Sequence, residues 1–147
     1  MPPRKFEALP YQYVLRMAEK YQLEFSMNTS PKVLYYRLST PAGLSEWFAD
    51  DVNSRGDNFT FFWDGAEEQA RVLAKKENQF VRFQWVNEDL SPVEEDCYFE
   101  FRISSEELTG EVSLLITDHA ETEQDKSDAI DLWEKQVSTL KHTLGIL

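Results

Sequence analysis

The chain has 147 residues, a length typical of one domain, and 41% of them are hydrophobic, enough for a packed core. Its formal net charge of −12 argues against a general nucleic-acid binder and against docking on an anionic membrane, because both depend on clustered lysine and arginine. The single cysteine, Cys97, excludes an intramolecular disulfide framework and leaves too few thiols for a cysteine-based zinc site.

Residues 1–20 differ from the rest of the chain, and we predict that they form an N-terminal extension. Three prolines among the first ten residues disfavour regular structure there. No stretch approaches the ~20 consecutive apolar residues of a membrane helix, and no apolar region of a signal peptide follows Arg4 and Lys5. We therefore interpret the sequence as that of a cytoplasmic protein without membrane insertion.

The segment 21–48 predicts a strand followed by two short helices. Apolar and polar residues alternate over 21–27, which is typical of a half-buried strand. Ser30 before Pro31, and again Thr40 before Pro41, combine an N-cap residue with a proline suited to the first helical turn. The apolar side of the second helix is expected to hold Leu44, Trp47 and Phe48.

The segment 50–119 predicts a run of antiparallel strands. Alternating patterns mark strands near Val52 and over 59–63, 66–76, 80–86, 97–103 and 112–116. One face of the strand over 66–76 is expected to hold Ala66, Glu68, Ala70, Val72 and Ala74. Cys97 is expected on a buried strand face, where a thiol is inert. Asp118 and His119 are expected after the last strand, Asp118 on the side of Leu114 and Ile116 and His119 on the opposite side, so that they need not interact.

The C-terminal segment predicts one long amphipathic helix over 124–144. Apolar residues recur there at spacings of three and four: Ile130, Trp133, Val137, Leu140 and Leu144. Thr122 or Asp125 is the candidate N-cap, and Gly145 ends the helix. One strand, two short helices, about six strands and a long helix make an α+β single domain.

Several short sequence segments, taken together in chain order, resemble those of a known superfamily. They are Ser30–Tyr35, Leu38–Pro41, Leu44–Phe48, the turn at Gly56, Phe83–Trp85, Leu114–His119, and finally Trp133 and Leu140. Together they resemble the START-like, or helix-grip, superfamily, in the branch related to the activator domain of the Hsp90 co-chaperone Aha1. The resemblance covers residues 21–147. It implies a curved antiparallel sheet of about six or seven strands wrapped on a long C-terminal helix, with two short helices after the first strand.

The resemblance also implies a cavity between the sheet and the C-terminal helix. The candidate ligand-binding residues are Phe61, Trp63, Phe83, Trp85, Phe99 and Phe101 on strands and Ile130, Trp133, Val137 and Leu140 on the helix. The same pattern is also that of an ordinary hydrophobic core. Four polar residues, Arg82, Gln84, Glu100 and Arg102, alternate with these positions, and they would favour an enzyme if they pointed into the cavity.

Three functions are open, because this superfamily contains lipid carriers, hormone binders, cyclases and chaperone regulators. The first is a non-enzymatic module that binds a hydrophobic small molecule or lipid. The second is a protein-interaction domain, like a co-chaperone, that acts through its acidic surface. Fifteen acidic and two basic residues lie between Glu88 and Asp131, which favours either a solvated surface or a basic protein partner. A homodimer is a further alternative.

The third function, a cavity enzyme, has little support in the motifs. The sequence lacks the HExxH and CxxC patterns of metal sites and the glycine-rich patterns of nucleotide and phosphate sites. It also lacks the GxSxG nucleophile motif. We therefore predict no catalytic residue, no metal and no cofactor.

Overall fold

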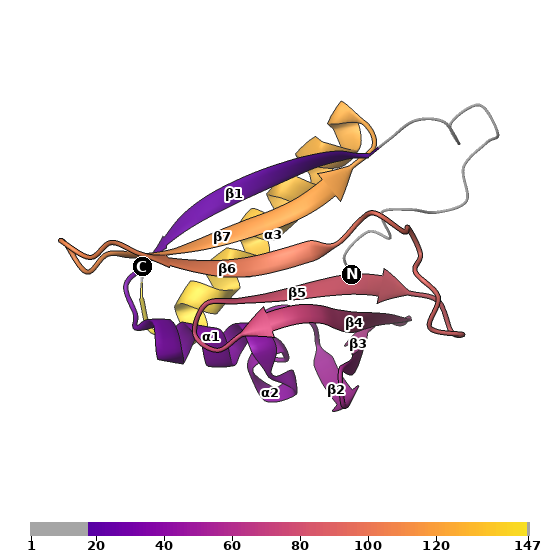
Figure 1. Ribbon diagram of the computed structural model, residues 1–147, viewed down its shortest axis with the longest axis horizontal. Coiled ribbons are helices and arrows are strands. Elements are labelled where there is room, and N and C mark those ends of the chain that lie inside the picture. Colours follow the sequence, from indigo (N-terminus) through magenta and orange to yellow (C-terminus); the bar gives the residue numbers. More distant parts are fainter. Residues whose placement is uncertain (1–17, 147) are drawn as a thin grey trace.

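Seven antiparallel strands form one sheet in the computed structural model, which describes residues 18–146. The strands are β1 (Glu19–Met27), β2 (Asp51–Arg55), β3 (Asn58–Trp63), β4 (Ala66–Lys76), β5 (Phe80–Val86), β6 (Phe99–Ser105) and β7 (Val112–Ala120). Their order across the sheet is β1-β7-β6-β5-β4-β3-β2, so β1 and β2 are the two edges. Figure 1 shows the strands rotating steadily from one edge to the other, which curves the sheet.

Three helices accompany the sheet. α1 (Pro31–Ser39) and α2 (Pro41–Leu44) follow β1, and α3 (Glu123–Thr143) ends the fold. The N-caps are Ser30, Thr40 and Thr122, since each side-chain oxygen accepts the backbone N–H of the third residue after it. Both prolines lie at the first helical turn, where no hydrogen-bond donor is needed. The predicted starts at Ser30 and Thr40 are therefore confirmed, and of the two candidate caps of the long helix, Thr122 and Asp125, the structure has Thr122.

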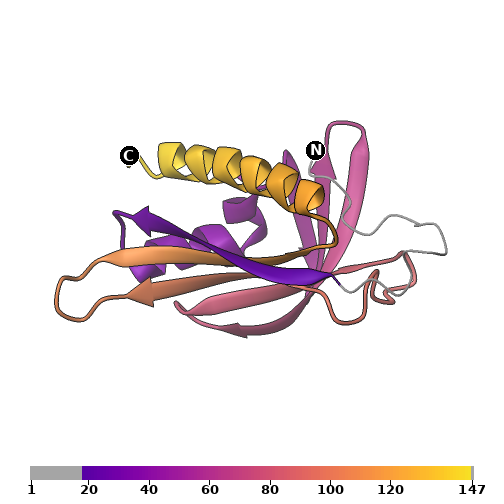
Figure 2. The same cartoon turned by 90° about the horizontal axis from the view of Figure 1, so that it is seen from above.

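The core lies between the concave face of the sheet and α3, which crosses that face (Figure 2). The large side chains with almost no exposed surface come from four strands and from all three helices: Phe61, Val81, Phe83, Phe99, Phe101, Leu114, Ile116, Leu34, Leu38, Leu44, Val137 and Leu140. The curved sheet thus packs around one side of the long helix, and the predicted α+β helix-grip fold is confirmed. No helix among residues 18–146 is long and apolar enough to span a membrane.

The structure differs from the predicted elements after α2 and before β6. α2 ends at Leu44, and Trp47 and Phe48 lie in the turns that follow it. Cys97 lies outside β6 and is partly exposed, so the prediction of a buried strand position is wrong. The reason is the side-chain amide of Gln84, which donates to the carbonyls of Glu94, Glu95 and Cys97 at 3.3, 2.9 and 3.2 Å. These contacts hold the segment before β6 as a loop.

Two strands differ from the prediction in register or length. β4 contains an irregularity between Val72 and Ala74, so that Val72 pairs with Phe83 on the core face but Ala74 pairs with Arg82 on the outer face. β7 continues to Ala120 because β1 pairs with it along its whole length, so Asp118 and His119 lie within the strand. Of the N-terminal extension predicted over residues 1–20, residues 1–17 lie outside the described residues. Glu19 and Lys20 belong to β1.

Candidate functional site

The predicted ligand-binding residues come together between the concave face of the sheet and α3. Phe61 and Trp63 lie on β3, Phe83 and Trp85 on β5, Phe99 and Phe101 on β6, and Ile130, Trp133, Val137 and Leu140 on α3. Eight of them are buried, whereas Trp85 and Ile130 are partly buried. We call the six strand residues the aromatic wall. Its rings pack tightly, since the centroid of Phe99 lies 5.1 Å from that of Phe83 and 4.9 Å from that of Trp85.

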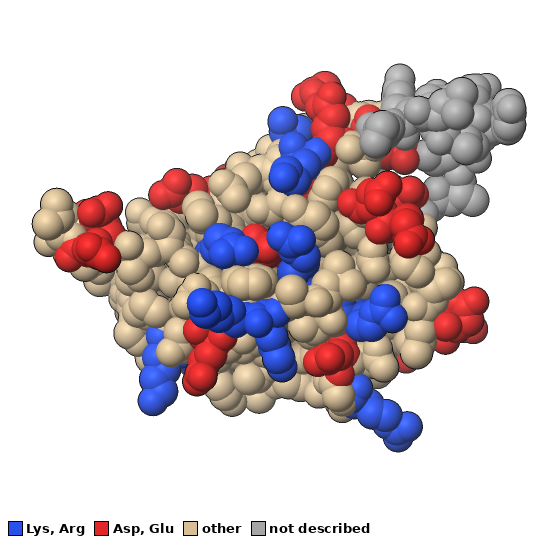
Figure 3. All heavy atoms as spheres, viewed as in Figure 1, with Lys and Arg blue, Asp and Glu red and all other residues tan. Residues whose placement is uncertain are grey.

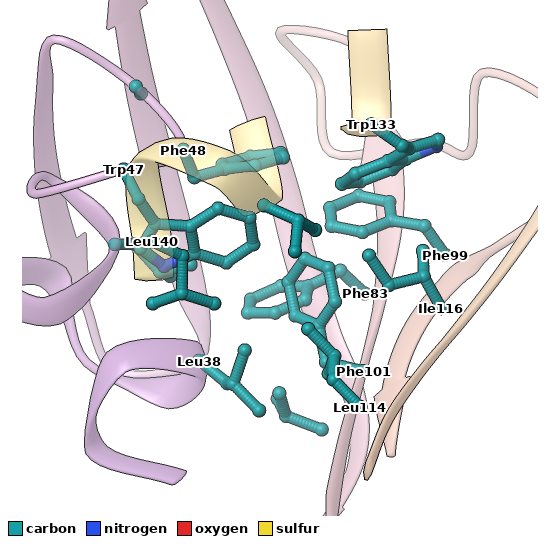
Figure 4. Close-up of a cluster of buried hydrophobic side chains, with 14 of the residues drawn as sticks. Leu38, Trp47, Phe48, Phe83, Phe99, Phe101, Leu114, Ile116, Trp133 and Leu140 are labelled. Carbon is teal, nitrogen blue, oxygen red and sulfur yellow. The ribbon is translucent and has the colours of Figure 1, made fainter. Parts of the chain in front are cut away.

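Phe48 occupies the space between the aromatic wall and α3 (Figure 4). Its ring centroid lies between 5.1 and 5.9 Å from those of Phe61, Trp63, Phe99, Phe101 and Trp133. The ring is held by a turn rather than by a helix or strand. Where the predicted cavity would lie, the centre is therefore filled by one of the chain's own side chains.

A surface groove of about 470 Å³ lies outside Phe48, between the segment 45–50 and α3. It is lined by Ser45, Glu46, Trp47, Phe48, Ala49, Asp50, Trp63, Leu132, Gln136 and Thr139. The backbone carbonyl of Phe48 accepts the indole N–H of Trp63 at 2.9 Å and the amide of Gln136 at 3.0 Å. These two hydrogen bonds fix the turn against both the sheet and α3.

The sequence reading missed the turn around Phe48 and the role of Gln136. The adjacent Trp47 and Phe48 are visible as an apolar pair, but their pattern indicates only a helix face. Gln136 lies between two apolar positions of the predicted helix. Nothing in the sequence around it indicates that its side chain donates a hydrogen bond to a backbone carbonyl 88 positions earlier. A long-range hydrogen bond of this kind leaves no trace in local periodicity.

A buried polar cluster lies at the other end of the concave face. Asp118 Oδ2 accepts the indole N–H of Trp133 at 3.0 Å and the hydroxyl of Tyr21 at 3.4 Å, and all three residues are buried. Asp118 shares the core face with Ile116, as the alternation predicts. Burial, with the Asp118 charge as a second cause, raises the pKa of Tyr21 far above its usual range. The cluster joins β1, β7 and α3.

A small cavity of about 10 Å³ adjoins this cluster, with room for about one water molecule. It is lined by Trp85, Val93, Glu94, Cys97, Tyr98 and Asp118. Burial, followed by the charges of Glu94 and Asp118, raises the pKa of the Cys97 thiol to about 12. Cys97 is therefore a poor nucleophile at neutral pH, since the thiolate is the reactive form.

Asp118 and His119 do not form a catalytic pair. The ring of His119 lies on the outer side of the sheet, where its Nδ1 is 2.9 Å from the carbonyl oxygen of Tyr98. The backbone N–H of His119 donates to Asp118 Oδ1 at 2.8 Å, but the two side chains point to opposite faces. The polar residues Arg82, Gln84, Glu100 and Arg102 also lie on the outer face, away from α3, because they alternate with buried core residues on β5 and β6.

The concave face thus offers apolar contacts and hydrogen bonds rather than reacting groups. In the polar cluster, the carboxylate of Asp118 accepts hydrogen bonds from the side chains of Tyr21 and Trp133. Within residues 18–146, no group of three His, Cys, Asp or Glu side chains is placed to hold a metal ion. The arrangement can bind and orient a molecule, and its described residues contain no nucleophile with an adjacent base.

Comparison with protein families assigns the same fold to nearly the whole chain. A family model described as a START-like superfamily domain matches residues 16–146. Comparison with curated proteins finds no match. The family match covers both the concave face and α3, so it includes every residue of the groove.

Solved structures with this fold are similar in shape and distant in sequence. The Aha1 dimer from Colwellia psychrerythraea has a TM-score of 0.66 at 17% identity, covering 84% of this chain and 94% of that one. Protein MLL2253 from Mesorhizobium loti has a TM-score of 0.68 at 16% identity, covering 86% and 97%. Protein ChR145 from Cytophaga hutchinsonii has a TM-score of 0.65 at 17% identity, covering 86% and 94%. At such identities the similarity establishes the fold alone.

Proposed function

This chain belongs to the START-like superfamily, and on that premise we propose that it is a non-enzymatic module that binds a hydrophobic small molecule or lipid beside α3. The observation that carries the proposal is the groove between the segment 45–50 and α3. Its volume of about 470 Å³ falls within the ~300–1,000 Å³ typical of small-molecule sites. The groove lies directly over the aromatic interior, from which it is separated by Phe48.

The lining of the groove favours an amphipathic ligand. Trp63, Phe48 and Leu132 offer apolar contact to a hydrocarbon or aromatic body. Gln136 and Thr139 lie beside them as hydrogen-bonding side chains, and Asp50 adds negative charge, whereas the charge of Glu46 is balanced by Arg37, whose Nε lies 2.7 Å from Glu46 Oε2. The Asp50 carboxylate repels an anionic head group. We therefore infer a ligand whose polar end is neutral or positively charged.

Deeper binding would require Phe48 to move, and the structure supports such a role for its turn. The ring is held by side-chain contacts and by two hydrogen bonds to one carbonyl, whereas the aromatic wall is fixed by the strand ladders. Because the turn lies outside the strand ladders, its displacement would leave the sheet intact and would cost the contacts of the Phe48 ring. Displacement of the Phe48 ring would place the ligand against the predicted residues of the aromatic wall and α3.

The test measures binding of a neutral apolar dye, N-phenyl-1-naphthylamine, and its displacement by three twelve-carbon amphiphiles. Dodecanol and dodecyltrimethylammonium are expected to displace the dye more strongly than dodecanoate, because Asp50 disfavours the anion. Thr139→Trp is expected to abolish binding, since it places an indole in the groove from an exposed position.

Ser138→Trp is the matched control, because Ser138 is exposed on the same helix but does not line the groove. The control is expected to bind the dye as the unchanged protein does. Equal dye binding by both tryptophan variants would refute the groove as the site. Absence of dye binding in the unchanged protein would refute the proposal as a whole.

A second candidate function, a protein-interaction domain, is supported by the loop between β5 and β6. The Gln84 contacts hold this loop in place, and its acidic side chains are exposed: Glu88, Asp89, Glu94, Glu95 and Asp96. Exposed carboxylates held in fixed positions are electrostatically complementary to a basic partner. One similar structure is that of the Aha1 dimer from Colwellia psychrerythraea, and a homodimer is therefore part of this candidate. Sedimentation equilibrium at 50 and 500 mM NaCl tests the dimer, which is refuted if the mass is that of one chain at both salts.

A further inference from the structure

The outer face of the sheet carries an ion cluster that the proposed function does not use. Glu100 is buried, with 5% of its side chain exposed, and it lies between Arg82 and Arg102. Arg82 Nη2 is 2.9 Å from Glu100 Oε1, and Arg102 Nε is 3.1 Å from Glu100 Oε2. Two arginines thus share one carboxylate, which leaves the cluster with a positive charge.

Both arginines are also held over aromatic rings. The guanidinium carbon of Arg82 lies 4.0 Å from the ring centroid of Tyr98, and that of Arg102 lies 4.3 Å from the ring centroid of Phe80. Each guanidinium is therefore fixed by a carboxylate on its edge and a ring against its face. Little side-chain entropy remains to be lost when these groups bind something else.

The fixed guanidinium groups still have donors that face solvent. Their contacts to Glu100 use only the Nε and Nη2 atoms. The Nη1 group of each arginine has no partner among residues 18–146, and 35% and 40% of the Arg82 and Arg102 side chains are exposed. The cluster therefore presents two pre-positioned groups of N–H donors on adjacent strands.

Two more cations lie on the same face. Arg71 pairs with Gln84 across β4 and β5, and Lys76 pairs with Phe80, which in turn pairs with Arg102. We call Arg71, Lys76, Arg82 and Arg102 the basic face. Figure 3 shows Lys and Arg side chains gathered over the middle of this side of the molecule. This concentration stands out in a chain whose net charge is −12.

We propose that the basic face docks a short, extended acidic segment of a partner protein. Neighbouring strands lie ~4.8 Å apart and alternate residues of one strand ~6.8 Å apart, so the register places Arg71, Arg82 and Arg102 on a diagonal at steps of roughly 8 Å, with Lys76 beside Arg82 and Arg102. Alternate carboxylates of an extended chain recur at about 6.8 Å, which lets successive acidic side chains meet successive cations. The Nη1 groups would donate to these carboxylates as charge-assisted hydrogen bonds.

The surroundings favour an acidic protein segment over nucleic acid. A single strand carries one charge about every 3.4 Å and extends beyond any small patch. Glu77 borders the basic face at one end, and Glu94, Glu95 and Asp96 precede Tyr98 at the other. A long polyanion would meet these carboxylates, whereas a short acidic segment ends within the basic face.

The test is an NMR titration of the ¹⁵N-labelled full chain at 50 mM NaCl. The probe is an eight-residue peptide of alternating glutamate and serine with blocked ends, and the matched control replaces each glutamate by glutamine. The glutamate peptide is expected to shift the amide signals of β4, β5 and β6, and the glutamine peptide to shift none. At 300 mM NaCl, affinity is expected to fall at least about tenfold, because exposed charges are screened.

Variants separate the basic face from general charge. Arg71→Gln with Lys76→Gln is expected to weaken binding at least about tenfold without changing the melting temperature, because neither side chain has a described ion pair. Lys32→Gln with Lys135→Gln removes two exposed charges elsewhere and is expected to leave binding unchanged. Arg82→Lys with Arg102→Lys keeps the charge but loses the Nη1 donors, and is expected to weaken binding several-fold.

Three results would overturn the proposal. One is the absence of amide shifts with the glutamate peptide at low salt. Another is equal affinity of the Arg71→Gln, Lys76→Gln variant and the unchanged protein. The third is tighter binding of an eight-nucleotide thymidine strand than of the peptide, which would assign the basic face to nucleic acid instead.

Discussion

Trp133 donates its indole N–H to Asp118 Oδ2 at 3.0 Å, which joins α3 to β7 inside the core. The Tyr21 hydroxyl, from edge strand β1, lies 3.4 Å from the same oxygen. One buried carboxylate therefore connects the long helix, an inner strand and an edge strand. Because a buried carboxylate without donors would be strongly destabilising, the three elements depend on one another for their positions.

Trp133→Ala is expected to lower the free energy of unfolding by ~3–5 kcal/mol, because it removes a buried ring that packs against Phe48 and Phe101. Trp133→Phe keeps most of the packing but removes the donor to Asp118, at an expected cost of ~1–3 kcal/mol. Urea unfolding followed by circular dichroism measures both. A loss below about 1 kcal/mol for Trp133→Ala would mean that the ring does not fill the core.

The raised pKa of Tyr21 predicts a loss of stability at alkaline pH. The unfolded chain releases this proton near pH 10, whereas burial keeps the folded hydroxyl protonated well above it. The folded state therefore binds more protons than the unfolded state above pH 10, and its stability falls as the pH rises. Below pH 10 both states hold the proton, and Tyr21 adds no pH dependence.

Unfolding free energies measured between pH 8 and 11 test this prediction. Tyr21→Phe is expected to flatten the decline above pH 10, while Tyr36→Phe, which changes an exposed residue, is expected to leave it as it is. Lysines also titrate in this range, but their contribution is common to all three proteins. Parallel curves for the Tyr21→Phe variant and the unchanged protein would contradict the assignment.

Most of the fold could be predicted because it depends on local patterns. The spacing of Ile130, Trp133, Val137 and Leu140 predicts α3, and the side-chain caps Ser30 and Thr122 predict where helices begin. These signals arise from residues three or four positions apart, which a sequence displays directly. The alternation in β7 likewise indicates that Asp118 shares the core face, although not that it lies within the strand.

The candidate site could be predicted only in part, because its remaining features depend on distant residues. Phe48 fills the interior from a turn, and the hydrogen bond of its carbonyl to Gln136 joins residues 88 positions apart. The segment before β6 is held as a loop because the side-chain amide of Gln84 donates a hydrogen bond to the carbonyl of Cys97. Neither contact has a periodic signature, so the helix predicted through Phe48 and the strand predicted through Cys97 extend too far.

Gly43→Ala is expected to destabilise the protein by about 1–3 kcal/mol or more, because the added Cβ would lie 2.2 Å from the carbonyl oxygen of Tyr36 and 2.6 Å from the Cα of Arg37. Both contacts are to backbone, so α1 and α2 must separate to admit the methyl group. Thermal unfolding measures the loss. Ala42→Ser, a change of similar size at the exposed neighbouring position, is expected to leave the melting temperature nearly unchanged. Equal melting temperatures for the two variants would show that the helices separate easily.

Cys97 is expected to react slowly with iodoacetamide in the folded protein. With its pKa raised to about 12, the thiolate fraction at pH 8 is roughly a thousand times smaller than for a free thiol. Mass spectrometry of timed samples measures the rate, and the same chain in 8 M urea, where the pKa returns to its ordinary value, is the control. The rate in urea is expected to exceed the folded rate by at least a hundredfold. Equal rates would mean that the thiol is neither buried nor surrounded by carboxylates in solution, and that the loop held by Gln84 is open.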